Sequence, residues 1–285
     1  MSFTFVGTVD GPVNGYYLSI ITHLRLAAGS KAAEEKSEAA FAFVGGETMR
    51  TIVYIDGFNL YYRMLKSRPG LKWLNPSKLI STILAPEHVI TRVNYYIARV
   101  SSRAYDPDAP ARQAKYLNAL RTVQEIKIHE GSFMTSEPWM PLASPPQAKP
   151  NGCDWTLPAP SVVKVQKYEE KGSDVNLAAH LVRDAFMGAF DAAVVVTNDS
   201  DLVEPIRIAT QEAGKRVGLL APVKYPNQSL MSVASFYLHI RPGHLAKAQF
   251  PVSIKTPDGT VINKPVSWVD ATEILDGALP ATPPA

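Results

Sequence analysis

The sequence predicts an α/β fold with a central parallel sheet flanked by helices. Short β-branched runs alternate with helical stretches along most of the chain, and this alternation is typical of strand–helix–strand units. Residues 51–55 and 192–197 are apolar or β-branched throughout, as expected for strands that are buried on both faces. Residues 174–190 have apolar side chains on one helical stripe, as expected for a helix that packs against such a sheet.

The first half of the predicted domain contains three strands and three helices. The strand over 51–55 precedes a helix over 58–66, which ends at Pro69-Gly70. Asn75 and Pro76 are typical of a helix start, so a second helix is predicted over 76–84. A strand over 92–100, an amphipathic helix over 109–123 and a strand over 125–129 follow.

The second half begins after a break in the pattern. Residues 137–160 hold seven of the 23 prolines and show no periodicity, which predicts a long surface loop. Strands are then predicted over 162–168, 192–197 and 216–220, and helices over 174–190, 202–213 and 229–237. Gly214 is a typical helix stop.

The two ends of the chain differ from this domain. Residues 1–48 are rich in Gly, Ala and Ser, and Met49 stands just before the first strand. We interpret them as an N-terminal extension that is disordered or not part of the native protein; an arm that packs on the domain is the alternative. Residues 241–285 form a C-terminal tail, in which Asp258-Gly259 between short apolar runs indicates a β-hairpin. The domain itself is predicted over 49–240.

The composition limits the classes of protein and site. The 29 basic and 26 acidic side chains give a net charge of +3, which is too balanced to argue nucleic-acid binding by itself. Cys153 is the single cysteine, so an intramolecular disulfide and a cysteine-based zinc site are excluded. The apolar stretch 16–28 is short and contains His23 and Arg25, so we expect no membrane span. Asp10 rather than a basic segment precedes it, so we expect no signal peptide. The single cysteine is consistent with a reducing setting, and we expect a cytoplasmic location.

Four aspartates carry the functional prediction. Asp56 follows the first strand, Asp174 begins a helix, and Asp199 and Asp201 follow the strand over 192–197. Ligand sites of parallel α/β sheets lie beyond the carboxyl ends of the strands, so we expect these carboxylates to gather there. Carboxylates that are close together repel one another unless a cation neutralises them, and oxygen ligands suit Mg²⁺ or Mn²⁺. Each aspartate alone is equally well explained as a helix cap or a turn residue.

Polar neighbours surround these aspartates. Asn59 lies three residues beyond Asp56, where its amide can point into the same pocket. Thr197 and Ser200 add hydroxyl groups beside Asp199 and Asp201. Lys171 is either a surface charge or a residue that faces an anionic ligand.

The chain resembles the NYN domain, a branch of the PIN-like nuclease superfamily, in three motifs. They are Ile55-Asp56-Gly57-Phe58-Asn59, Lys171-Gly172-Ser173-Asp174 and Val196-Thr197-Asn198-Asp199-Ser200-Asp201-Leu202. The resemblance covers residues 50–240. It implies a PIN-like three-layer fold, an acidic pocket that binds Mg²⁺ or Mn²⁺, and hydrolysis of RNA by a metal-dependent endoribonuclease.

The resemblance also assigns roles to residues. The catalytic and metal-binding carboxylates would be Asp56, Asp174, Asp199 and Asp201, and the supporting residues Asn59, Lys171, Thr197 and Ser200. The chain departs from the family at one position: many relatives have an acidic residue six positions after the one that matches Asp174, where this chain has His180. The role of His180 is left open, with a partly buried helix residue as the simplest interpretation.

An RNA substrate requires basic and aromatic contacts near the pocket. The topology suggests Tyr62, Arg63, Arg99 and Arg103, with Tyr61, Lys66 and Arg112 as further candidates. Packing of the tyrosines on the sheet and solvation of the arginines at the surface are the alternatives.

Two other functions are open at this point. Some chains with similar NYN domains are called 6-hydroxy-3-succinoylpyridine hydroxylases, enzymes of nicotine degradation. The present sequence has no Gly-x-Gly-x-x-Gly fingerprint after a strand and no evident two-His-one-carboxylate set. The other alternative is a non-catalytic RNA-binding or regulatory module, to which four mutually repelling aspartates would bring no advantage. The RNA target, the number of metal ions and the formation of a homo-oligomer are left open.

Overall fold

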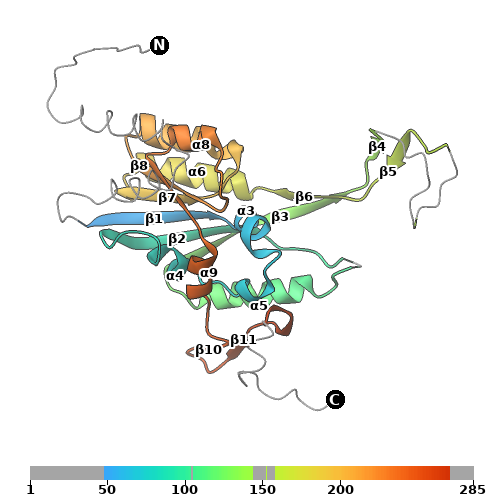
Figure 1. Cartoon of the computed structure of the whole chain (residues 1–285), viewed down its shortest axis with the longest axis horizontal. Coiled ribbons are helices and arrows are strands. Elements are labelled where there is room, and N and C mark those ends of the chain that lie inside the picture. Colours follow the sequence, from blue (N-terminus) through green and yellow to red (C-terminus); the bar gives the residue numbers. More distant parts are fainter. Residues whose placement is uncertain (1–47, 104, 144–151, 153–157, 270–285) are drawn as a thin grey trace, which may run out of the picture. The chain divides into compact units, whose positions relative to one another are not determined.

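Seven strands form the central sheet, in the order β6-β3-β2-β1-β7-β8-β9 (Figure 1). Every neighbouring pair is parallel except β3 and β6, which are antiparallel. The predicted α/β fold with a central, mostly parallel sheet is therefore confirmed. The strands are β1 Met49–Asp56, β2 His88–Ala98, β3 Ile126–Ser136, β6 Lys167–Lys171, β7 Ala192–Val196, β8 Arg216–Ala221 and β9 Phe236–His239.

The computed structural model describes residues 48–103, 105–143, 152 and 158–269. The expectations for residues 1–47 and for the end of the C-terminal tail, 270–285, lie outside these residues. From Met49 onwards, apart from Ala85–Glu87, the described chain belongs to one compact unit. Within this part of the chain, none of the helices has the length and apolar character needed to cross a membrane.

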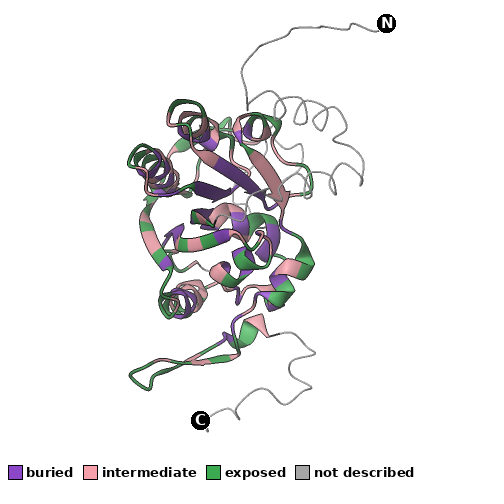
Figure 2. Cartoon of the chain, turned by 90° about the vertical axis from the view of Figure 1, so that its left-hand side faces the viewer, coloured by how far each residue is buried: buried purple, intermediate pink, exposed green. Residues whose placement is uncertain are grey.

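Helices cover both faces of the sheet, as the predicted three-layer fold requires (Figure 1). Alternate side chains of β1 point to opposite faces: Val53 and Ile55 belong to one core, and Ile52 and Tyr54 to the other. Figure 2 shows the buried residues gathered in the sheet and on the inner sides of the helices. The first core is covered by α3 Gly57–Leu60, which continues as η1 Tyr61–Leu65, and by α4 Pro76–Ser81, α5 Ala109–Arg121 and α9 Pro242–Lys247; the second by α6 Ser173–Phe186, α7 Val203–Arg207 with η4 Ile208–Glu212, and α8 Gln228–Val233.

The ends of two helices follow directly from the sequence. The side chain of Asn75 accepts a hydrogen bond from the backbone N–H of Lys78 at the start of α4, and Pro76 occupies the first helical position. Gly172 precedes α6 with a φ of 95°, a left-handed conformation that glycine adopts without strain. Because α6 begins directly after Gly172, Asp174 lies in the first turn of this helix.

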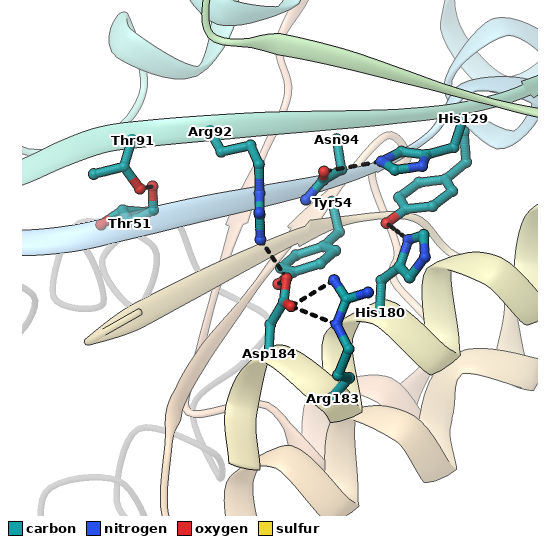
Figure 3. A network of polar contacts seen from close by, with 10 residues as sticks. Thr51, Tyr54, Thr91, Arg92, Asn94, His129, His180, Arg183 and Asp184 are labelled. Atoms are coloured by element: carbon teal, nitrogen blue, oxygen red, sulfur yellow. Dashed lines mark hydrogen bonds and ion pairs between the residues drawn. The ribbon is translucent and has the colours of Figure 1, made fainter. Parts of the chain in front are cut away.

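A network of buried polar side chains joins α6 to the sheet (Figure 3). Asp184 of α6 accepts a hydrogen bond of 2.8 Å from the hydroxyl of Tyr54 and is ion-paired with Arg92 and Arg183. One turn before Asp184 in α6, His180 forms a hydrogen bond of 3.0 Å with the hydroxyl of Tyr96. Buried hydrogen bonds and ion pairs of this kind fix the position of a helix, so these contacts hold α6, and with it Asp174, at a defined place on the sheet.

Several segments differ from the sequence predictions. Strand β3 runs to Ser136, seven residues beyond the strand expected over 125–129. The single strand expected over 162–168 is divided into β5 Val162–Lys164 and β6, and β5 pairs with β4 Trp139–Pro141. The segment expected to be a loop therefore contains a strand. The helix expected over 229–237 ends at Val233, because Phe236–His239 pairs with β8 as the edge strand β9.

The described part of the C-terminal tail packs on the first core. Strands β10 Ser253–Lys255 and β11 Val261–Asn263 pair in antiparallel fashion, and Gly259 has a φ of 87° in the turn between them. The indole N–H of Trp73 donates a 2.8 Å hydrogen bond to the carbonyl of Pro251, and its ring lies 6.3 Å from that of Trp268. Residues 242–268 thus help to bury the aromatic side chains beneath α5.

Candidate functional site

A hollow of about 450 Å³ lies beyond the carboxyl ends of β1 and β7. This is the place where ligand sites of parallel α/β sheets are found. We refer to it as the acidic pocket, because four of its lining side chains are carboxylates. The residues that line it are Asp56, Phe58, Asn59, Tyr62, Arg63, Arg103, Phe133, Tyr168, Glu170, Asp174 and Asp199.

Asp56 is the most buried carboxylate of the pocket. It is the last residue of β1 and only 5% exposed. One carboxylate oxygen accepts the backbone N–H of Asn59 at 2.9 Å, and the other accepts the hydroxyl of Thr197 at 3.1 Å. The pKa of Asp56 is raised to about 7, mainly by burial; the nearby charges of Asp174 and Asp199 contribute to the rise, and the two hydrogen bonds oppose it. Asp56 is therefore both the cap of α3 and a wall of the pocket.

Hydrogen bonds connect the segment after β7 to the junction of β1 and α3. The hydroxyl of Thr197, which donates to Asp56, accepts the backbone N–H of Asp199 at 3.0 Å. The side-chain oxygen of Asn59 accepts the backbone N–H of Asn198 at 3.1 Å. Asn59 and Thr197 thus hold the segment that contains Asp199 at a fixed distance from Asp56.

Asp174 brings a third segment of the chain into the pocket. It lies in the first turn of α6 and is half-buried. Its pKa is raised to about 6, mainly by burial and in part by the charges of Glu170, Asp199 and Asp201. The charges of Asp174 and Asp199 thus act on Asp56, and that of Asp199 also acts on Asp174, although the three residues come from separate parts of the sequence.

The other site residues predicted from the sequence lie around the pocket or away from it. Thr197 is buried behind Asp56. Ser200 and Asp201 are exposed and do not line the hollow, although the backbone N–H of Asp201 donates to Asp199 at 3.0 Å. Lys171 is exposed and pairs with Glu169 at 3.4 Å. His180 also lies outside the lining, in the network shown in Figure 3.

The basic and aromatic candidates divide in the same way. Tyr62, Arg63 and Arg103 line the pocket. Arg99 does not, and its guanidinium pairs with Glu130 on the exposed surface. Arg112 pairs with Asp106.

Four lining residues were not predicted from the sequence: Phe58, Phe133, Tyr168 and Glu170. Phe58 lies within the motif that contains Asp56, so its position two residues later was a usable signal. The other three depend on the antiparallel pairing of β3 with β6, which the sequence pattern does not reveal. The carboxylate of Glu170 accepts the backbone N–H and the hydroxyl of Ser173, so it also stabilises the start of α6.

Comparison with known proteins identifies the family of the chain. The profile of the NYN domain matches residues 50–241. The chain belongs to the NYN domain family. This family assignment places the protein in a nuclease-like superfamily.

Two known proteins are similar to this NYN protein over much of its length. A 6-hydroxy-3-succinoylpyridine 3-monooxygenase of Pseudomonas putida is 31% identical over 258 residues, which cover 82% of this chain and 80% of that protein. A crystal structure of a protein of unknown function from Vibrio parahaemolyticus has a TM-score of 0.41 at 15% identity, over 73% of this chain and 100% of the other.

Proposed function

We propose that this NYN protein is a metal-dependent ribonuclease that hydrolyses RNA phosphodiester bonds at the acidic pocket. The observation that carries the proposal is that Asp56, Asp174 and Asp199 line one hollow, where burial and neighbouring carboxylates raise the pKa of Asp56 and of Asp174. Such a group is costly for a folded chain unless a cation offsets the repulsion. Membership of the NYN domain family supports the same conclusion.

The donor set of the pocket fits Mg²⁺ or Mn²⁺. Its candidate ligands are oxygen atoms only, which these hard cations prefer. As the side chains stand, no group of three or more His, Cys, Asp or Glu among the described residues is close enough to hold a metal ion. Mg²⁺ keeps several waters and binds proteins through one or two carboxylates, so a pocket of about 450 Å³ leaves room for the ion and its waters. We propose Asp56, Asp174 and Asp199 as the direct or water-mediated ligands, with Asp201 at the margin.

The bound ion would supply charge that stabilises the phosphodiester and acidifies a water molecule. The residues of the chain would bind the phosphate, accept the proton and hold the carboxylates in place. Arg63 and Arg103 lie in the same hollow and offset the repulsion between an RNA phosphate and the carboxylates. A carboxylate whose pKa is raised toward neutrality, such as Asp174, accepts a proton from water more readily than an ordinary aspartate. The hydrogen bonds of Thr197 and Asn59 keep Asp56 and Asp199 in fixed positions relative to each other.

A cleavage assay on a mixed RNA pool tests the proposal. We expect cleavage with Mg²⁺ or Mn²⁺, none with a chelator, and a loss of about 100-fold or more in Asp199→Asn. The matched control is Asp108→Asn, which changes an exposed aspartate whose side chain makes no hydrogen bond to the helix that follows it. Cleavage by Asp199→Asn at the rate of the parent would refute the catalytic assignment. RNA binding without cleavage under any metal would instead establish a non-catalytic module.

The second candidate function is monooxygenation of a substituted pyridine. It is favoured by the 31% identity with the Pseudomonas putida protein over 82% of this chain. The aromatic side chains and arginines of the pocket would contact a pyridine ring and the carboxylate of a succinoyl group. The reaction requires O₂ and a two-electron reductant, so the test is incubation with 6-hydroxy-3-succinoylpyridine, NADH and air, with and without added flavin or iron. Turnover of the pyridine together with no cleavage of RNA would replace the first candidate by the second.

A further inference from the structure

One wall of the acidic pocket is aromatic and comes from two antiparallel strands. We call the paired segments 132–136 of β3 and 167–171 of β6 the β3–β6 ribbon. Phe133 is paired with Glu170, and Thr135 with Tyr168. Directly paired residues of antiparallel strands have their side chains on the same face, so Phe133, Tyr168 and Glu170 share one face. All three line the pocket, whereas Met134 on the other face of the ribbon does not.

Phe58 of α3 and Tyr62 of η1 line the pocket beside this wall, and the aromatic side chains here are only partly used for packing. The ring of Phe58 meets that of Phe133 edge to face at 5.5 Å, and the ring of Tyr62 lies 6.2 Å from Phe58 at an interplanar angle of 30°. Tyr62 is 53% exposed and Tyr168 is 38% exposed. Large aromatic surfaces left open beside a hollow are characteristic of binding sites.

A positive charge lies over the same wall. The guanidinium of Arg103 is 4.9 Å from the centroid of the Tyr168 ring. A planar guanidinium stacks on aromatic rings and on bases, and its N–H groups bind phosphate or base edges. Arg103 thereby complements an anionic ligand with flat rings better than a neutral apolar one.

We propose that Tyr62, Phe133, Tyr168 and Arg103 form a base-stacking subsite for one unpaired RNA base. The inference rests on the proposed ribonuclease function, since the adjoining carboxylates mark where the phosphodiester would lie. Aromatic side chains stack on bases whatever their identity, because every base has a π-face. A base within a duplex has both faces covered, so the subsite selects single-stranded RNA and positions the neighbouring phosphate toward Asp56, Asp174 and Asp199.

Binding of a single-stranded RNA that carries 2-aminopurine tests the subsite. The titration is done in EDTA, so that affinity is measured without cleavage, and stacking is read from the quenching of 2-aminopurine fluorescence. We expect Tyr168→Ala to bind about 10-fold more weakly and to quench less, and Tyr168→Phe to match the parent because it keeps the ring. Met134→Ala is the control on the opposite face of the same ribbon, where the side chain is 49% exposed; it should also match the parent.

An abasic position in the RNA gives a second test that leaves the protein unchanged. The parent should lose about the same 10-fold in affinity when the stacking base is removed, and Tyr168→Ala should lose nothing further. Equal affinity of the parent for the intact and abasic RNA at every position, or for duplex and single-stranded RNA, would overturn the subsite. Cleavage by the parent with unchanged binding by Tyr168→Ala would overturn the subsite alone. Quenching that depends on Tyr168 without any cleavage would keep the subsite and refute the ribonuclease.

Discussion

Replacement of Asp56 by asparagine should stabilise the metal-free protein at alkaline pH. Burial and the charges of Asp174 and Asp199 raise the pKa of Asp56 from its ordinary value of 3.8 to about 7. Each pKa unit corresponds to about 1.4 kcal/mol, so the negative charge on Asp56 costs the folded state about 4 kcal/mol. Asparagine removes this cost. Its side-chain oxygen can still accept the backbone N–H of Asn59, the hydrogen bond by which Asp56 caps α3 in the parent.

The sign of the pH dependence follows from the direction of the shift. The pKa is higher in the folded state, so the stability linked to the proton on Asp56 is fully present below about pH 4 and is lost as the pH rises through about 7. The free energy of unfolding of the parent should therefore fall over this range by up to about 4 kcal/mol more than that of Asp56→Asn. Added Mg²⁺ should restore part of this loss in the parent and little in the variant, because the cation binds the charged form.

Urea denaturation in EDTA at about pH 5 and about pH 8, repeated with Mg²⁺, measures these differences. Asp108→Asn is the control, since it removes an exposed carboxylate that makes no hydrogen bond to its helix. An Asp56→Asn variant less stable than the parent at the higher pH would refute the reasoning. So would a parent whose stability depends on pH no more than that of the variant.

Three further predictions concern the supports of the site. Asp184→Ala should lower the free energy of unfolding, measured by chemical denaturation, by about 3 kcal/mol, because Tyr54 and Arg92 would lose their buried partner. A decrease below about 1 kcal/mol would contradict the role of the network. Gly57→Ala should lower the free energy of unfolding by about 1–3 kcal/mol, since the added Cβ would lie 2.6 Å from the backbone carbonyl oxygen of Tyr96. Gly243→Ala is the control: nothing lies within 4 Å of its added Cβ, so its melting temperature should not fall. Thr197→Val should require about 10-fold more Mg²⁺ for half-maximal cleavage, because it removes the hydroxyl between Asp56 and Asp199; an unchanged requirement would argue against that support.

The sheet could be predicted where burial or capping leaves a local signal. Residues 51–55 and 192–197 lie at the centre of the sheet and are buried on both faces, so their apolar and β-branched pattern identifies them as strands. Asn75 and Pro76 marked the start of α4 through their side-chain chemistry. Strand β9 was missed because it is a short edge strand directly after a helix, and its pairing with β8 places the Phe236 ring where a side chain at Gly218 would otherwise lie. No local signal reports such a contact.

The candidate site shows the same division. Asp56 and Asp199 could be predicted because each follows a recognisable strand, and both line the pocket. Glu170, Phe133 and Tyr168 could not, because only the register of β3 with β6 brings them to the same face. Arg99 has the charge that a nucleic-acid contact requires, yet it pairs with Glu130 instead. The type of a residue thus indicates what it can do, but the pairing of distant strands decides whether it reaches the pocket.

The rate of RNA cleavage as a function of Mn²⁺ concentration, compared between the parent and Asp174→Asn, tests the proposed metal site most directly. If the acidic pocket holds the catalytic cation, the parent should show no cleavage without metal and a saturable rise with it. Asp174→Asn should then need about 10-fold or more Mn²⁺ for half-maximal cleavage, or fail to cleave at all. Cleavage by the parent in a chelator, or the same Mn²⁺ requirement in both proteins, would contradict the account.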